Sequence, residues 1–490
     1  MSAKGKSKSS DIRKSLSHPI VDSDGHWREF EPIAMDYIKK VGGPQLADKW
    51  SKKVRMFGEG EYAKMTRQDK ADRRHGQPPW WSMPVKNTID VATSLVPKLL
   101  HDRLPEMGMD FTVLYPSNVQ LFAPYLSDDE LRQVGSRALN EYAADVWAEH
   151  SDRCAPVGMI PMNTPEEAVA ELEHCKKIGI KAVALGSLIR RPIKALEGKG
   201  VSRRYSCYLD VLGIDSPYDY DPVWAKCVEL GYPLSFHTAS EAYGLRNSVS
   251  NFVFNHIGHF GEAGNAVAKA MFLGGVTRRF PKLKVAFLEG GVAWGCSVFS
   301  DLIGHWEKRN KDIIQDFNPE HVDFAKIGEY LKQHGGERYA SRFDEFKSHW
   351  GKAQIFTPEN LDDFAAAKIE KKRDIYDLYV PHYYFGCEAD DSTTAYAFAS
   401  KSNPFHAKLN AILASDISHF DVLDMSEILE EAWEMVEEKG MSEEDFKAFT
   451  FSNAVDLWTG TNPDFFKGTA VEKDVNQYLA QRGTPKLHGT

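Results

Sequence analysis

The chain has 490 residues, of which 42% are hydrophobic and 27% charged, and its formal net charge is −10. This acidic balance argues against binding to nucleic acid or to an anionic membrane surface, and no apolar run is long enough to cross a membrane. The 6 cysteines are scattered without a CxxC pair, which is typical of a reduced compartment, so we expect a cytoplasmic protein.

Short apolar runs alternate along the chain with segments of helical periodicity. We predict strands at 19–24, 110–115, 155–161, 180–185, 233–237, 283–288, 383–385 and 411–415. Thr164-Pro165 is a helix start, and the periodic segment behind it ends at Gly179. Strands that alternate with helices in this way predict a distorted (β/α)₈ TIM barrel of the α/β class, with a doubly wound open sheet as the alternative.

The chain is longer than the roughly 250 residues of a simple barrel, so we expect additional segments. Residues 1–17 are basic and serine-rich and are predicted to be a disordered tail, and the barrel is predicted to span 18–460. Insertions are expected at about 31–109, after the first strand, and at 318–380, after the sixth. Residues 461–490 lack clear periodicity and are expected to form a C-terminal arm, which would embrace the second subunit of a homodimer.

Acidic and imidazole side chains stand where several predicted strands end. Asp24 and His26 follow the first strand, His237 ends the fifth, Glu289 follows the sixth and Asp416 follows the eighth. In a parallel barrel these ends open onto one face, where a cluster can form. Two imidazoles with two or three carboxylates suit one divalent ion, zinc as the first choice and manganese as the second.

The sequence also resembles a known family. The pieces VDSDGHWREFEP, YDPVWAKCVELGYPLSFHTAS, GGVTRRFPKLKVAFLEGGVAW and ASDISHFD occur in the order found in the amidohydrolase superfamily. They are most similar to the branch that contains aminocarboxymuconate semialdehyde and hydroxybenzoate decarboxylases. The resemblance implies a barrel with a single metal ion held by Asp24, His26, His237 and Asp416.

Two positions depart from the family pattern. Asp24 stands where many members have a histidine, and Glu289 stands where many place a catalytic histidine. Glu289 is therefore expected to be either a ligand or an acid/base group. His419, three residues beyond Asp416, is expected to orient that aspartate or the substrate.

Three further features could contact a substrate. His256 and His259 follow the fifth strand, Trp80 and Trp81 lie in an aromatic loop, and Arg190 follows the fourth strand. Each also has a simpler interpretation: packing for the aromatic residues and a solvated charge for the arginine.

Together these features predict a metal-dependent hydrolase that acts on a small organic, possibly aromatic, substrate through a metal-activated water. Non-oxidative decarboxylation of an aromatic or enolic acid is the alternative. A barrel without catalysis, used only for binding, is a third interpretation. On any of these, the expected partner is a small molecule, without nucleic acid or membrane.

Overall fold

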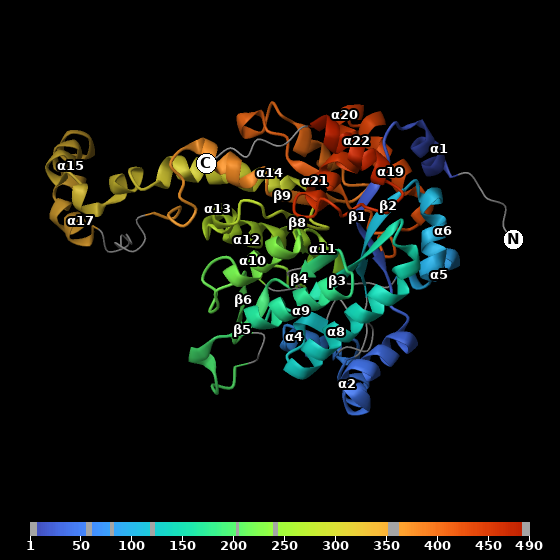
Figure 1. Ribbon diagram of the computed structural model, residues 1–490. Helices are drawn as coiled ribbons and strands as arrows, with labels where there is room; N and C mark the ends of the chain where they lie inside the picture. The colour runs from blue at the N-terminus through green and yellow to red at the C-terminus, as the bar shows by residue number, and fades with distance from the viewer. Residues whose placement is uncertain are drawn as a thin grey trace.

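The computed structural model describes residues 7–54, 61–78, 83–117, 123–201, 205–238, 244–350 and 362–482. An 8-stranded sheet runs in the order β1-β2-β3-β4-β7-β8-β9-β10, and all its printed pairs are parallel. Helices surround the strands (Figure 1). The predicted (β/α)₈ barrel is therefore confirmed. Its strands are β1 Val21–Trp27, β2 Phe111–Pro116, β3 Cys154–Ile160, β4 Ala182–Leu185, β7 Leu234–Phe236, β8 Val285–Phe287, β9 Tyr383–Cys387 and β10 Asn410–Leu413.

Backbone contacts bring the last strand back to the first. The Asp416 amide donates to the Asp24 carbonyl, and the His26 amide donates to the Ile417 carbonyl, each at 3.0 Å. The buried Asp22 carboxylate accepts from the Ser415 amide and hydroxyl at 2.9 and 2.8 Å. These bonds hold the end of β1 next to the chain that follows β10, which places Asp24, His26 and Asp416 together.

The helices around the barrel begin and end at the signals visible in the sequence. The Thr164 hydroxyl accepts from the Glu167 amide at the start of α9, and Gly231 ends α10 at φ 79°. The helices of this layer are α8 Asp129–Val146, α9 Pro165–Lys177, α10 Asp221–Leu230, α11 Phe252–His256, α12 His259–Leu273, α13 Val276–Arg279, α14 Ala293–Arg309, α18 Lys372–Tyr379, α19 Ile428–Glu437, α20 Glu443–Lys447 and α21 Asn453–Thr459.

Both predicted insertions are helical where they are described. The first holds α2 Glu31–Lys53, kinked at Gly43, then α3 Glu61–Lys64, α4 Arg67–Asp72, α5 Thr88–Leu95 and α6 Pro97–Met107. The second holds α15 Phe324–Tyr330, α16 Gly336–Ala340 and α17 Phe343–His349. In Figure 1, α15 and α17 project far from the barrel, and no residue of these three helices is buried.

An antiparallel hairpin was not predicted. It pairs β5 Ile189–Pro192 with β6 Cys207–Asp210, between β4 and α10. β5 begins only a few residues after β4 ends, so the sequence pattern could not distinguish β5 from the loop that follows β4.

The prediction of a disordered tail over 1–17 is wrong where the chain is described. Lys8–Ser15 form helix α1, with the Ser7 hydroxyl capping its first turn. The Ser9 side chain is buried and accepts a hydrogen bond from the Glu430 amide of α19. A polar helix of about two turns is ordered here by tertiary contact, which local composition does not reveal.

The C-terminal segment packs against its own barrel. Phe465 and Phe466 are buried in one cluster with Phe111 and Val157 of the barrel strands, and Val475 of α22 Glu472–Arg482 belongs to the same cluster. Residues 461–482 therefore close the end of the barrel where the strands begin, instead of extending as an arm, and 483–490 lie outside the described residues. Within the described chain, no helix has the length and apolar character needed to cross a membrane.

Candidate metal centre

The end of β1 delivers two side chains to the barrel mouth. Asp24 and His26 flank Gly25, where the pairing of β1 with β2 shifts register. A Cβ atom on Gly25 would lie 2.4 Å from Thr112 Oγ1 and 2.7 Å from Asp22 Oδ2. Position 25 therefore requires glycine because neighbouring side chains leave no room for a Cβ atom, and not because the chain turns there.

Gly25→Ala is expected to lower the free energy of unfolding by about 1–3 kcal/mol, because neither close neighbour can move without breaking the Thr112–Asp22 hydrogen bond. Thermal unfolding of the two proteins measures the loss. Gly304→Ala is the matched control, since Gly304 lies in α14 with no atom within 4 Å of the added Cβ. That control should be neutral or slightly stabilising, and an equal loss in both variants would contradict the interpretation.

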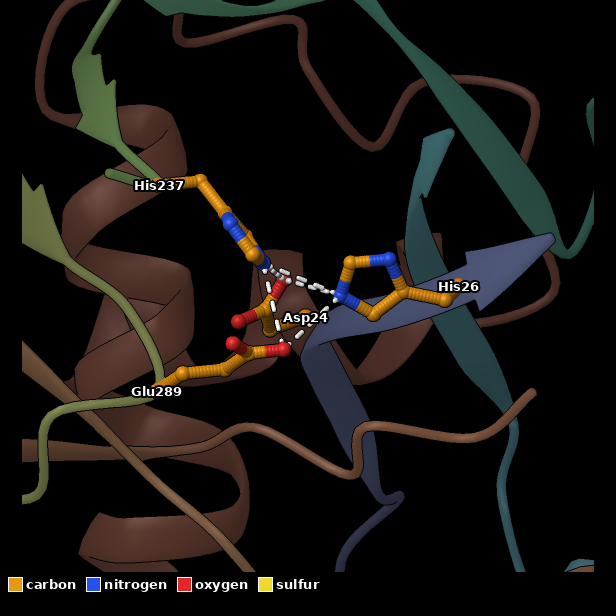
Figure 2. A group of neighbouring side chains, drawn as sticks. All are labelled: Asp24, His26, His237 and Glu289. Atoms are coloured by element: carbon orange, nitrogen blue, oxygen red, sulfur yellow. Dashed lines mark hydrogen bonds and ion pairs between the residues drawn. The ribbon is translucent and has the colours of Figure 1, made fainter. Parts of the chain in front are cut away.

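Two imidazoles and two carboxylates meet at the mouth, as Figure 2 shows. His26 and His237 face each other with Nε2 atoms 3.0 Å apart. Glu289 Oε1 lies 3.3 Å from both Nε2 atoms, and Asp24 Oδ1 lies 3.6 Å from both. Donor atoms held about 2.0–2.1 Å from one zinc ion at tetrahedral angles lie ~3.4 Å apart. These separations are therefore those of ligands around a common centre.

A second group shares two members with the first. His419 Nδ1 lies 2.6 Å from Asp416 Oδ1 and 3.0 Å from Glu289 Oε1, and Asp416 Oδ1 lies 3.2 Å from His26 Nε2. The rings of His26 and His419 stack at 3.7 Å between centroids. Glu289 belongs to both groups, whereas Asp416 is grouped with His26, Glu289 and His419 and not with Asp24 and His237. Glu289 thus sits among the predicted ligands more centrally than Asp416 does.

The donor set fits a cation. Both Asp24 oxygens, Glu289 Oε1 and Asp416 Oδ1 are buried without a hydrogen-bond partner in the described chain. Burying such oxygens is costly unless a positive charge compensates. Ser117 Oγ lies 3.1 Å from His26 Nδ1 and can hold the proton there, which leaves the Nε2 lone pair directed into the cluster.

Burial and neighbouring charge set the pKa values of the cluster. Burial raises the pKa of Asp24 and of Asp416 well above the ordinary value. Burial also acts to raise the pKa of Glu289, but the charges of His237 and His419 outweigh it and hold that pKa well below its usual value. Burial lowers the pKa of His26 well below the usual value, which keeps this imidazole neutral and able to bind a metal.

The backbone at two of these carboxylates is strained. Glu289 has φ 53° and Asp416 has φ 51°, in the left-handed region that non-glycine residues seldom adopt. Glu289 lies two residues beyond the end of β8, and Asp416 lies three residues beyond the end of β10. Strain of this kind is concentrated at functional sites, where the surrounding structure holds it in place.

A cavity of about 100 Å³ adjoins the cluster and is lined by His256, Gly258, His259, Phe260, Glu289, Glu388, His419, Phe420 and Asp421. His256 and His259 both line this cavity, and their contact with a substrate stays a prediction. Burial lowers the pKa of His259 to about 3, so its ring is neutral near pH 7. Glu388 was missed by the sequence analysis. The sequence does carry a signal for it, because it directly follows Cys387, the last residue of the seventh barrel strand.

The remaining candidates for substrate contact are Arg190, Trp80 and Trp81. Arg190 is on the exposed face of β5 and is not among the described residues that line the cavity. Its neighbour Arg191 is buried and donates to Asp210 at 3.0 Å, which is a structural contact. Trp80 and Trp81 lie outside the described residues.

Comparison with known proteins identifies a matching family and solved structures with a similar fold. The family model described as Amidohydrolase matches residues 106–355, more than half of the 490-residue chain. An amidohydrolase from Mycobacterium avium subsp. paratuberculosis K-10 superimposes with a TM-score of 0.52 at 16% identity, covering 91% of this chain and 98% of that one. A dihydroxybenzoic acid decarboxylase from Polaromonas sp. JS666, solved with manganese and 2-nitroresorcinol, gives a TM-score of 0.48 at 14% identity, covering 92% and 99%.

One curated relative aligns over part of its length. It is a 2-amino-3-carboxymuconate-6-semialdehyde decarboxylase from Dictyostelium discoideum, 26% identical over 182 residues. The alignment covers 37% of this chain and 44% of the relative, so this chain matches less than half of that protein. The family model agrees with the barrel and with the motifs noted in the sequence, and we conclude that the chain belongs to the amidohydrolase family and is an enzyme of that superfamily.

Proposed function

We propose that this protein is a metal-dependent non-oxidative decarboxylase of a small aromatic or enolic acid. The observation that carries the proposal is the Asp416–His419 pair, which joins the metal-ligand cluster to the cavity: Asp416 contacts His26, and His419 lines the cavity wall. The 182-residue segment that is 26% identical to the Dictyostelium decarboxylase also supports it. This choice reverses the order in which the sequence alone placed hydrolysis and decarboxylation.

Asp24, His26, His237 and Glu289 would hold the ion, with Asp416 at the edge of the cluster. A divalent ion held by these residues would supply a Lewis acid that stabilises negative charge on the substrate. Manganese and zinc both accept this mixture of nitrogen and oxygen ligands, and we propose that the ion is one of these two.

The chain's own residues would then supply the proton. When the bond from carbon to the carboxylate breaks, its electron pair stays on the carbon, carbon dioxide leaves, and a proton must reach that carbon. Asp416 would hold this proton, and His419, 2.6 Å away at the cavity wall, would pass it to the substrate or keep the Asp416 carboxyl in position. The rings of His256, Phe260 and Phe420 would enclose a flat substrate and exclude water.

Hydrolysis is the second candidate, because Glu289 lies 3.3 Å from both ligand imidazoles, where a base could accept a proton from an attacking water. A screen of hydroxybenzoic acids, amides and esters separates the two. It should follow carbon dioxide and released acid in separate assays of protein reconstituted with zinc and with manganese. Carbon dioxide release without hydrolysis is expected, and the opposite pattern would contradict the proposal.

We also propose that the chain forms a homodimer. Because residues 461–482 cover their own barrel, the candidate contact is the projecting α15–α17 segment. Its helices bury none of their own residues, and they line a groove of about 560 Å³ with Ile327, Leu331, Tyr339 and Phe346. Helices this short that bury nothing gain little stability in isolation, so a second copy that covers the groove would stabilise them.

The double variant Tyr339→Glu/Phe346→Glu is therefore expected to shift the protein from dimer to monomer, measured by light scattering after size-exclusion chromatography. Both side chains are exposed, at 57% and 40%, so the barrel should remain folded. Tyr396→Glu, at a 55% exposed tyrosine outside the segment, is the control. A monomeric wild-type protein would contradict the proposal.

A further inference from the structure

The cavity beside the cluster has an acidic wall. Glu289, Glu388 and Asp421 all line it, together with three histidines, and none of the described residues that line it is a lysine or an arginine. Arg246 approaches the cavity at Gly258, but its Nε donates to Glu262 at 2.8 Å, so its charge is already paired. The wall away from the metal cluster is therefore short of positive charge.

Glu388 has no compensating partner. Within the described chain, its carboxyl makes no hydrogen bond or ion pair, and the side chain faces the cavity from the end of β9. Burial raises the pKa of Glu388 well above its ordinary value, and the charges of Asp421 and Glu289 raise it further. A carboxyl group enclosed in this way is costly unless a ligand supplies a hydrogen-bond donor.

The charges at the site limit what the substrate can carry. A divalent ion would already be balanced by the carboxylates of Asp24 and Glu289, and the reacting carboxylate of the substrate adds a further negative charge. A second carboxylate on the substrate would then lie near Glu388 and Asp421 in a small, poorly solvated cavity. Such a carboxylate offers Glu388 no hydrogen-bond donor, and its charge is repelled by Asp421 and, whenever Glu388 is ionised, by Glu388 as well.

Resting on the proposed function, we propose that Glu388 determines substrate specificity: it accepts a hydrogen bond from an amino or hydroxyl group on the end of the substrate remote from its reacting carboxylate, and it excludes a second carboxylate there. Discrimination of this kind combines one favourable contact with one repulsive contact. A site built around a buried acceptor also rejects an analogue that leaves the acceptor unpaired.

The test is a binding measurement on full-length protein loaded with manganese. Isothermal titration calorimetry gives the Kd of salicylate and of its derivatives with an amino, hydroxyl or carboxyl group at ring position 4 or 5. In the wild type, the tightest amino or hydroxyl derivative is expected to bind about tenfold or more tighter than the carboxyl derivative of the same position. Glu388→Gln is expected to reduce that ratio to about threefold or less, mainly by tightening the carboxyl derivative.

Asp390→Asn is the matched control, because it removes a carboxylate two residues away that is exposed and is not among the cavity-lining residues. It should keep the wild-type ratio. Equal affinities in the wild type, a ratio unchanged in Glu388→Gln, or no binding of the amino and hydroxyl derivatives would each overturn the inference. Failure of the proposed function looks different: the binding preference would persist, but no derivative would release carbon dioxide.

Discussion

Asp416→Asn is expected to reduce kcat by roughly 10²- to 10⁴-fold while the barrel remains folded, because the amide keeps the shape of the side chain but cannot release a proton. The decarboxylation rate on the best substrate of the screen measures the loss. Circular dichroism and metal analysis of the same sample test whether fold and metal are retained. A variant with full activity would remove Asp416 from the mechanism.

Because Asp416 and His419 are in contact, combining substitutions at both residues tests whether they act together. If the two side chains act as one proton-carrying unit, His419→Gln should cause a loss similar in size, and the double variant should be little worse than either single variant. Multiplicative losses would show that the two residues act separately. Asp22→Asn is the contrasting variant: Asp22 is also buried, but it accepts from Ser415 and Thr112 and holds the strands together. It should lower the melting temperature.

Removal of the metal is expected to abolish turnover and to lower the melting temperature by roughly 5 °C or more, since an ion present at about 1,000 times its Kd contributes about 4 kcal/mol to the folded state. The physical reason is the set of buried carboxylate oxygens of Asp24, Glu289 and Asp416, which lack hydrogen-bond partners in the described chain. Dialysis against a chelator, followed by addition of zinc or manganese, measures both effects. A melting temperature that does not respond to metal would contradict the centre and would support a barrel without catalysis.

This metal-dependent stabilisation should grow as the pH rises from about 5.5 to 8. The pKa values of Asp24 and Asp416 are raised by burial, so without metal these groups stabilise the fold when protonated and lose that contribution as pH rises through their folded pKa values. Glu289 acts in the opposite direction, because its pKa is lowered. The proposed ligands Asp24 and Glu289 must both be deprotonated to hold a cation, so its binding strengthens with pH. An equal shift in melting temperature at both pH values would contradict this assignment.

The sequence by itself determined the barrel and most of the residues at its mouth. The eight apolar runs are the eight strands, with ends displaced by at most three residues, because buried parallel strands require continuous apolar sequence. Asp24, His26, His237 and Glu289 could be placed together from sequence because each stands at a strand end, and parallel strands in a barrel open onto one face.

Only the tertiary structure decided how the remaining side chains are arranged. The sequence near each residue does not show that Glu289 lies at the centre of the cluster and Asp416 at its edge. Their positions depend on the left-handed backbone conformation after β8 and β10. Glu388 could be identified as a site residue only once the structure showed that β9 ends at Cys387. Arg190 lies in the β5–β6 hairpin, which begins too soon after β4 for the sequence pattern to distinguish it. The ordered helix Lys8–Ser15 and the packing of residues 461–482 against the barrel depend on contacts between residues hundreds of positions apart. Periodicity reports which face of a segment is buried, but what lies against that face is set by the whole fold.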